Sequence, residues 1–280
     1  MNIKITADST CDLSPELIKK YDIRIIPLHI IKADDSDYLD GIDIRPQDIF
    51  DYVDTVGKAC HTAAVNVEEF EKVFSEELET HDAIVHVDIS SDFSACYQNA
   101  CIAAEGRNVY VIDSRNLSTG VGHIVLDAAE LAAQGVPPEE IKRTLDEKQK
   151  KLDVSFVINT LKYLHKGGRC SALVALGANV LQLKPCIEVK DGKMGVGKKY
   201  RGSFEKAIKQ YVRDRLESRD DIDYKRIFIT HSDCSHELVE QVRALIAELG
   251  PFEEIIETDA GCTVSNHCGP NCLGVLFYRK

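Results

Sequence analysis

Short β-rich runs alternate with segments of helical period in the first half of the sequence, and this alternation restricts the fold more than any other feature. The β-rich runs are separated by helix-length segments rather than by two-residue turns, so successive strands are expected to run parallel through right-handed crossovers. A mostly parallel sheet covered by helices on both faces is therefore predicted. The runs are NIKITA (2–7), IRIIPLHI (23–30), DAIVHVDI (82–89) and NVYVID (108–113).

The helices between these runs are predicted from capping residues and apolar periodicity. Ser14 is a favoured N-cap and Pro15 suits a first turn, so a helix should follow the first strand. An acidic segment leads to a helix from Pro46 and then to a polar loop around His61 and Thr62. Further helices are predicted over 67–78, from about Phe93 to 105, and over 117–135.

The pattern changes after the Gly-Val-Pro-Pro turn at 135–138 and one more charged helix. LKPCIEVKDGKMGVGKKY (183–200) alternates as a β-hairpin does, with Asp191 and Gly192 at its turn. This mixture predicts two domains, an α/β domain over 1–151 and an α+β domain over 152–280. The later helices are predicted over 203–217 and 235–250, and the later strands over 225–231, 252–258 and 273–279.

Net charge and cysteine usage exclude some classes of protein. A formal charge of −12 provides no basic face to neutralise phosphates, which argues against a nucleic-acid-binding protein. Ten cysteines are scattered along 280 residues that begin without a signal-peptide pattern, which indicates reduced thiols and a cytoplasmic protein. The apolar runs are shorter than the roughly 18 residues that a membrane span takes.

Two nucleotide-binding motifs can be set aside. GKMGVGK (192–198) matches the start of a Walker A loop, but Lys199 stands where Ser or Thr is required. The match also falls in the predicted hairpin rather than between a strand and a helix, so it is attributed to chance. The sequence has no G-x-G-x-x-G, which leaves a nicotinamide cofactor unsupported.

The segment AGCTVSNHCGPNCLGV (260–275) places Cys262, Cys268 and Cys272 around His267. Such a cluster fits a metal site, a nucleophilic centre, or a polar pocket that only binds. Structural zinc sites pair two half-sites, and the sequence offers no second one here. Small buried thiols are the favoured interpretation of the cysteines, and a zinc-dependent protein is kept as a third hypothesis.

Polar turns follow three of the predicted parallel strands. HVDISSDFSACYQNA (86–100) runs from a buried strand through Ser91 and Asp92 into a helix, and VIDSRNLSTG (111–120) and TADST (6–10) share this form. Open α/β sheets bind ligands at the carboxyl ends of their strands, and a helix N-terminus suits an anion. Three such ends favour a site, although any one serine could simply cap a helix.

Several segments together resemble the DegV family, bacterial fatty-acid-binding proteins that include the FakB subunits of fatty acid kinases. They keep the family order and span nearly the whole chain. The segments are ITADSTCDL (5–13), HTAAVNVEEF (61–70), ISSDFSACYQNA (89–100), VIDSRNLSTG (111–120), NTLKYLHKGGRCS (159–171), LGANVLQLKPCIEVKDG (176–192), RGSFEKA (201–207) and NHCGPNCLGVLF (266–277).

The resemblance implies an architecture and a function. An N-terminal α/β domain would hold a mostly parallel sheet and a C-terminal α+β domain a largely antiparallel one, with a long-chain fatty acid buried between them. Such a protein has no catalytic residues, metal or cofactor of its own. It presents the carboxylate of its fatty acid to a separate ATP-dependent kinase, which makes an acyl phosphate. A transient contact with a membrane surface is compatible with this role.

The resemblance also assigns residues to the site. Thr62 and Ser94 would bind the carboxylate through their hydroxyls, with His267 in the same hydrogen-bond network. Two serines of the strand-end turns, Ser91 and Ser118, are further binding candidates. Arg201 would lie at the edge of the network, and Arg169 would dock the kinase.

The sequence departs from the family pattern in three places. The usual Thr-Ser-x-Pro-Ser reads TAAVN at 62–66, Leu-Ser-Gly-Thr-Tyr reads FSACY at 93–97, and Gly-Pro-Gly reads GPN at 269–271. The three acid-binding residues remain, while the surrounding walls differ. The preferred chain length and saturation of the acid therefore stay open.

A lipid ester hydrolase is the alternative function, with Ser94 as nucleophile and His267 as base. It would use the same residues as the binding protein. The flanks of Ser94 are Phe93 and Ala95, so the G-x-S-x-G elbow of such hydrolases is missing. The sequence also singles out no carboxylate that would orient the histidine.

Overall fold

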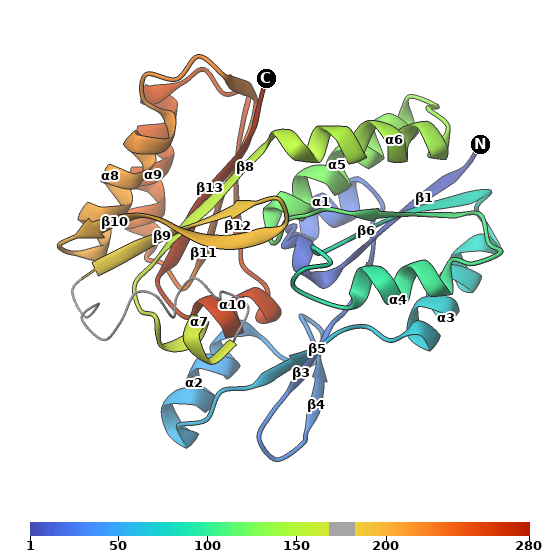
Figure 1. The fold of residues 1–280 in the computed structure, drawn as a ribbon, viewed down its shortest axis with the longest axis horizontal. Coiled ribbons are helices and arrows are strands. Elements are labelled where there is room, and N and C mark those ends of the chain that lie inside the picture. Colours follow the sequence, from blue (N-terminus) through green and yellow to red (C-terminus); the bar gives the residue numbers. More distant parts are fainter. Residues whose placement is uncertain (168–182) are drawn as a thin grey trace.

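The N-terminal half of the chain is built on a four-stranded sheet in the order β2-β1-β6-β7 (Figure 1). The computed structural model describes residues 1–167 and 183–280, with side chains described up to 164 in the first range. Every pairing in this sheet is parallel, which confirms the prediction from the alternating pattern. The strands are β1 (Ile3–Asp8), β2 (Arg24–Ile26), β6 (Ala83–Asp88) and β7 (Val109–Asp113).

Helices cover both faces of this sheet. Helices α5 and α6 lie on one face and α3 and α4 on the other (Figure 1). Ser14 caps α1 as predicted, since its Oγ accepts a hydrogen bond from the backbone N–H of Leu17. The helices are α1 (Pro15–Lys20), α3 (Val67–Leu78), α4 (Cys96–Ala103), α5 (Thr119–Ala133) and α6 (Pro138–Lys148), with short 3₁₀ turns at Ser9–Cys11 and Gln149–Lys151.

The C-terminal half forms a six-stranded sheet in the order β10-β9-β8-β13-β11-β12. All pairings are antiparallel except that of β11 with β12, so the largely antiparallel sheet is confirmed. Helices α8 (Phe204–Leu216) and α9 (His236–Leu249) pack together on its outer side (Figure 1). The strands are β8 (Leu152–Ile158), β9 (Leu183–Lys190), β10 (Lys193–Arg201), β11 (Ile222–Ser232), β12 (Glu254–Asp259) and β13 (Cys272–Arg279).

The predicted fold class is therefore correct, whereas the division of the chain at residue 152 stays a prediction. The hairpin expected over 183–200 is present as β9 and β10, which places the Walker-like GKMGVGK in a hairpin. Among the described helices, none combines the length and the apolar character that a membrane span requires.

A third, three-stranded sheet was not predicted. It has the order β4-β3-β5 and lies next to helix α2 (Pro46–Val56). The single strand expected over 23–30 is divided at Pro27, because proline has no N–H to continue a ladder; β2 precedes it and β3 follows it. The expected loop at His61 and Thr62 is strand β5. The strands are β3 (His29–Ile31), β4 (Asp37–Leu39) and β5 (His61–Ala63).

Two helix predictions also need correction. The helix expected from Phe93 begins at Cys96, because the N–H groups of Phe93 and Ser94 both bond to the carbonyl of Ser90 in a turn. His267, in a segment for which no helix was predicted, lies in the last turn of a short helix, α10 (Cys262–Cys268). The Gly-Pro turn begins one residue after this helix, where Gly269 has φ +77°. Helix α7 spans Lys162–Gly167.

The hairpin turn makes Gly192 sensitive to substitution. Asp191 and Gly192 have φ values of +50° and +79°, as a two-residue type I′ turn requires. We expect Gly192→Ala to lower the free energy of unfolding by about 1–2 kcal/mol, measured by urea denaturation, because a Cβ disfavours left-handed backbone. Gly195→Ala is the control: a Cβ there has open space, so stability should be unchanged or slightly higher. Equal losses in both variants would contradict this account.

Candidate functional site

A cavity of about 220 Å³ lies where the two halves of the chain meet. Its walls come from residues that follow the parallel strands, from β5, from β10 and from helix α10. Most of the lining is apolar and includes Leu28, Ile89, Phe93, Leu117, Leu164, Met194 and Val264. Among the described residues, the polar side chains of the lining are Thr62, Ser94, Thr263 and His267. The cavity thus suits an apolar ligand that carries a small polar group.

Thr62 and His267 form the polar corner of this cavity. Thr62 Oγ1 lies 3.0 Å from Nε2 of His267, although the two residues are 205 positions apart in the chain. Thr62 is in the middle of β5, where it pairs with Ile30 of β3. The corner therefore exists only because the small sheet of the N-terminal half packs against α10.

Ser94 enters the cavity from the turn before α4. Its Oγ donates a hydrogen bond to Sγ of Cys96 at 3.2 Å and accepts one from the backbone N–H of Cys96 at 3.3 Å. Thiols are weak hydrogen-bond partners, so the hydroxyl can turn toward a ligand at small cost. Ala95 beside it is exposed, which puts this end of the cavity near the surface.

The structure thus places Thr62, Ser94 and His267 in the lining of one cavity, while their role in binding a carboxylate stays a prediction. Ser91 is exposed and donates to Oδ2 of Asp113 at 2.6 Å, outside the cavity lining. Ser118 is buried, and its hydroxyl donates to Asp12; it lines a smaller cavity of about 20 Å³ that shares Leu117, Val264 and Cys268 with the first.

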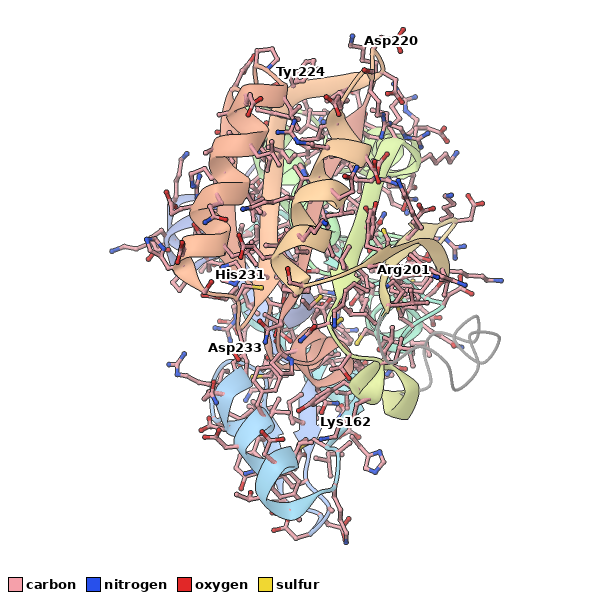
Figure 2. The ribbon with its side chains drawn as sticks, turned by 90° about the vertical axis from the view of Figure 1, so that its left-hand side faces the viewer. Lys162, Arg201, Asp220, Tyr224, His231 and Asp233 are labelled. Carbon is pink, nitrogen blue, oxygen red and sulfur yellow. The ribbon has the colours of Figure 1, made fainter. Side chains whose placement is uncertain are left out.

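The two arginine candidates are not placed at the cavity by the structure. Arg201 is exposed at the end of β10 (Figure 2). Arg169 lies outside the described residues. Any role of these arginines, of Ser91 or of Ser118 in binding stays a prediction.

Thr263 is a cavity residue that sequence reasoning missed. It precedes His267 by four positions, so the two side chains lie on one face of α10. Its Oγ1 is buried and has no hydrogen-bond partner among the described residues. The sequence signal for Thr263 is its spacing of four residues from His267. This spacing indicates a shared face only if 262–268 is a helix, which the sequence did not predict.

Beneath Ser94 lies a buried acidic cluster of Asp8 and Asp88 with Cys96. One ligand atom from each lies within 4.8 Å of the others, a spacing that could hold a cation, and no other such set of three occurs among the described residues. The cysteines of 260–275 do not form one. Nε2 of His86 lies 3.0 Å from Oδ1 of Asp88, while its Nδ1 meets the hydroxyl of Thr6 at 2.7 Å.

Burial dominates the electrostatics of this cluster. Burial, together with the nearby charge of Asp88, raises the pKa of Asp8 to about 7, against hydrogen bonds that lower it. Those hydrogen bonds come from the backbone N–H groups of Ile89 and Thr10 and from the Thr10 hydroxyl. The strand-end turns of β1 and β6 therefore do meet, as predicted, but their free N–H groups bind a carboxylate of the protein itself.

Matches to known proteins agree with this fold and cavity. Residues 2–280 match the family model described as "Uncharacterised protein, DegV family". A DegV domain-containing protein of Caldanaerobacter subterraneus subsp. tengcongensis is 34% identical, over 99% of both chains. The chain therefore belongs to the DegV family.

Two solved structures extend the comparison. A DegV family protein of Thermus thermophilus, described by its fatty acid binding, superposes with a TM-score of 0.87 at 31% identity, covering 100% of both chains. A stearic acid-binding protein of Eubacterium ventriosum superposes with a TM-score of 0.87 at 25% identity, covering 99% of this chain and 98% of that one.

The raised pKa of Asp8 predicts a pH dependence of stability. Between about pH 4 and pH 7 the folded state holds a proton that the unfolded state releases, so the free energy of unfolding should fall as the pH rises through this window. Asp8→Asn should remove a fall on the order of a few kcal/mol, measured by urea denaturation at a series of pH values. Asp220→Asn, at an exposed position, is the control and should leave the slope as in the wild type. An unchanged slope in Asp8→Asn would refute the raised pKa.

Proposed function

We propose that this protein binds a long-chain fatty acid in the cavity, with the carboxylate at Thr62, Ser94 and His267 and the acyl chain along the apolar walls. The observation that carries the proposal is a cavity with apolar walls whose hydroxyls and imidazole gather at the Thr62–His267 corner. The family relatives described as binding fatty acids or stearic acid support the same class of ligand.

The energetics of binding favour an arrangement in which the acyl chain supplies most of the affinity and the carboxylate only needs hydrogen-bond partners. Burial of an acyl chain gains about 0.8 kcal/mol per methylene, which supplies affinity from the tail alone. The carboxylate then needs enough polar partners to avoid being stranded in an apolar site. Two hydroxyls and an imidazole can do this without enclosing both oxygens, as a bidentate arginine would.

We further propose that the bound acid is presented to a partner fatty acid kinase, which phosphorylates the carboxylate. The polar corner supports this, because Ala95 and His61 beside it are exposed while the apolar walls lie deeper. A carboxylate held by hydroxyls near the surface keeps one oxygen available to attack a phosphate. The kinase would supply ATP and the transfer chemistry, and this chain would supply the oriented acid.

A Ser/His hydrolase finds less support in this geometry. The hydroxyl of Ser94 donates to Cys96, and Nε2 of His267 faces Thr62. A hydrolase would need the histidine as a base within hydrogen-bond reach of the serine. The binding function is therefore the one that the site supports best.

Loss of the two hydroxyls tests the head-group assignment. We expect the double variant Thr62→Val with Ser94→Ala to weaken stearate binding by at least about a hundredfold, since each hydrogen bond to a charged group contributes about 1.5–3 kcal/mol. Binding can be measured by titration calorimetry after delipidation, and co-purifying acid by native mass spectrometry. Ser75→Ala, at an exposed position of α3 outside the cavity lining, is the matched control and should bind as the wild type does. A wild-type protein that never loads a fatty acid would overturn the proposal.

A substitution at the exposed Ala95 can separate fatty acid binding from presentation of the bound acid to the kinase. We expect Ala95→Gln to leave stearate affinity nearly unchanged, because the residue borders the cavity at its surface end. Bulk at this point should slow acyl phosphate formation by an added fatty acid kinase and ATP, measured by trapping the product with hydroxylamine. Unimpaired turnover in this variant would argue against presentation through this end.

A further inference from the structure

Helix α10 carries Thr263, Val264, His267 and Cys268 into the cavity, yet it is only seven residues long. Isolated helices of this length are unstable in water, so its position depends on contacts with other segments. Its N-cap is Gly261, which has no side chain to satisfy the first backbone N–H groups. Those groups must be satisfied from elsewhere in the chain.

Two buried carboxylates of the N-terminal half satisfy them. Oδ1 of Asp40 accepts from the N–H of Cys262 at 2.8 Å, and its Oδ2 accepts from the N–H of Thr263 at 3.0 Å. The N–H of Gly261 donates to Oδ1 of Asp12 at 2.9 Å. The contacts join residues 222, 223 and 249 positions apart in the chain. A Cβ on Gly261 would lie 2.9 Å from Oδ1 of Asp12, so only glycine leaves room for this carboxylate.

Asp40 is itself held in place. Its side chain also accepts from the hydroxyl of Ser9 at 3.1 Å, and its backbone N–H donates to the carbonyl of Leu28 at 2.9 Å. The residue is 4% exposed. A fixed carboxylate at the start of a helix satisfies the orphan donors and complements the positive end of the helix dipole.

The other end of α10 is held against the segment that carries Thr62. Nδ2 of Asn266 donates to the carbonyl of Cys60 at 3.1 Å, two residues before Thr62. One turn of helix therefore separates the carboxylate caps from the contact of His267 with Thr62. A shift of the helix start would move the imidazole relative to the Thr62 hydroxyl.

We propose that Asp40 is a positioning residue for head-group recognition: by capping α10, it fixes the imidazole of His267 against Thr62. The inference rests on the proposed binding of a fatty acid, and it adds a determinant that does not touch the ligand. Asparagine at position 40 keeps the volume but turns one acceptor into an NH₂ group. That NH₂ group would face the N–H of Cys262 or Thr263. One of the two capping hydrogen bonds would be lost, and two hydrogen-bond donors would face each other.

The test compares a ligand that has the carboxylate with one that lacks it. We expect Asp40→Asn to weaken stearate binding by about tenfold, the size expected for loss of a helix cap, while methyl stearate binds as to the wild type. Asp54→Asn is the matched control, because this aspartate of α2 is 75% exposed and should leave both affinities unchanged. Equal weakening for acid and ester would show a merely structural role and overturn the proposal.

A double-mutant cycle identifies the route. If Asp40 acts through His267, then Asp40→Asn should add nothing to the loss caused by His267→Ala. Additive losses would overturn the proposal. Should Asp40→Asn fail to fold, Gly261→Ala disturbs the same cap from the side of Asp12 and should give the same acid-selective loss; equal loss for acid and ester would again refute it.

The ring of His267 gives a readout that does not need a ligand. The imidazole ¹⁵N shifts of His267 should change in Asp40→Asn and stay as in the wild type in Asp54→Asn. A wild-type protein that binds no fatty acid would refute the proposed function, while these shifts would still test the cap. Unchanged shifts in Asp40→Asn, with fatty acid binding intact in the wild type, would refute the positioning role alone.

Discussion

The burial of helix α5 between the two large sheets is the constraint on which the rest of the structure depends. Residues Thr119 to Ala129 are all buried, as expected for a helix that is covered on every side. One side packs on the parallel sheet, and the other contacts β13 of the antiparallel sheet. Two polar contacts fix the arrangement: Nε2 of His123 lies 3.0 Å from the carbonyl oxygen of Leu276, and the hydroxyls of Thr119 and Thr230 meet. Because both sheets pack on one rigid element, the space in front of its N-terminus persists as a cavity, with Leu117 in its wall.

At the carboxyl edge of a parallel sheet, free backbone N–H groups at the strand ends and helix N-termini usually form a site suitable for phosphates. Here the protein's own buried carboxylates occupy many of them: Asp8 binds the turns after β1 and β6, and Asp12 and Asp40 bind the start of α10. Among the described residues, the polar side chains left at the cavity carry hydroxyls and an imidazole. Under the proposed function these groups would bind one carboxylate at the head of an apolar chain. Asp12 and Asp40, which join the two halves of the chain through α10, leave the first N–H groups of that helix unavailable to a ligand.

Local sequence predicted the parts of the fold that local physics determines. Alternation of strand and helix period sufficed for the parallel sheet, and Asp191 with Gly192 sufficed for the hairpin. The small sheet escaped prediction because three-residue strands show no period. Helix α10 escaped because its caps are more than 200 residues away. For the site, the family resemblance indicated Thr62, Ser94 and His267, while the cap by Asp40 and the place of Thr263 in the cavity lining become visible only when α10 is in place.

Three departures from the family pattern, Ala63, Phe93 and Ala95, fall on the walls of the cavity rather than on its polar corner. Ala63 and Ala64 both line the cavity, where the pattern has a serine after the threonine. Two small apolar side chains leave room and remove a competing hydroxyl, so Thr62 is the hydroxyl that this segment offers. Cys96 takes the place of a threonine beneath Ser94, and its thiol competes weakly for the serine hydroxyl. Under the proposed function, the hydroxyl of Ser94 would give up only this weak bond when a carboxylate binds, which would favour an exchangeable contact over a permanent one.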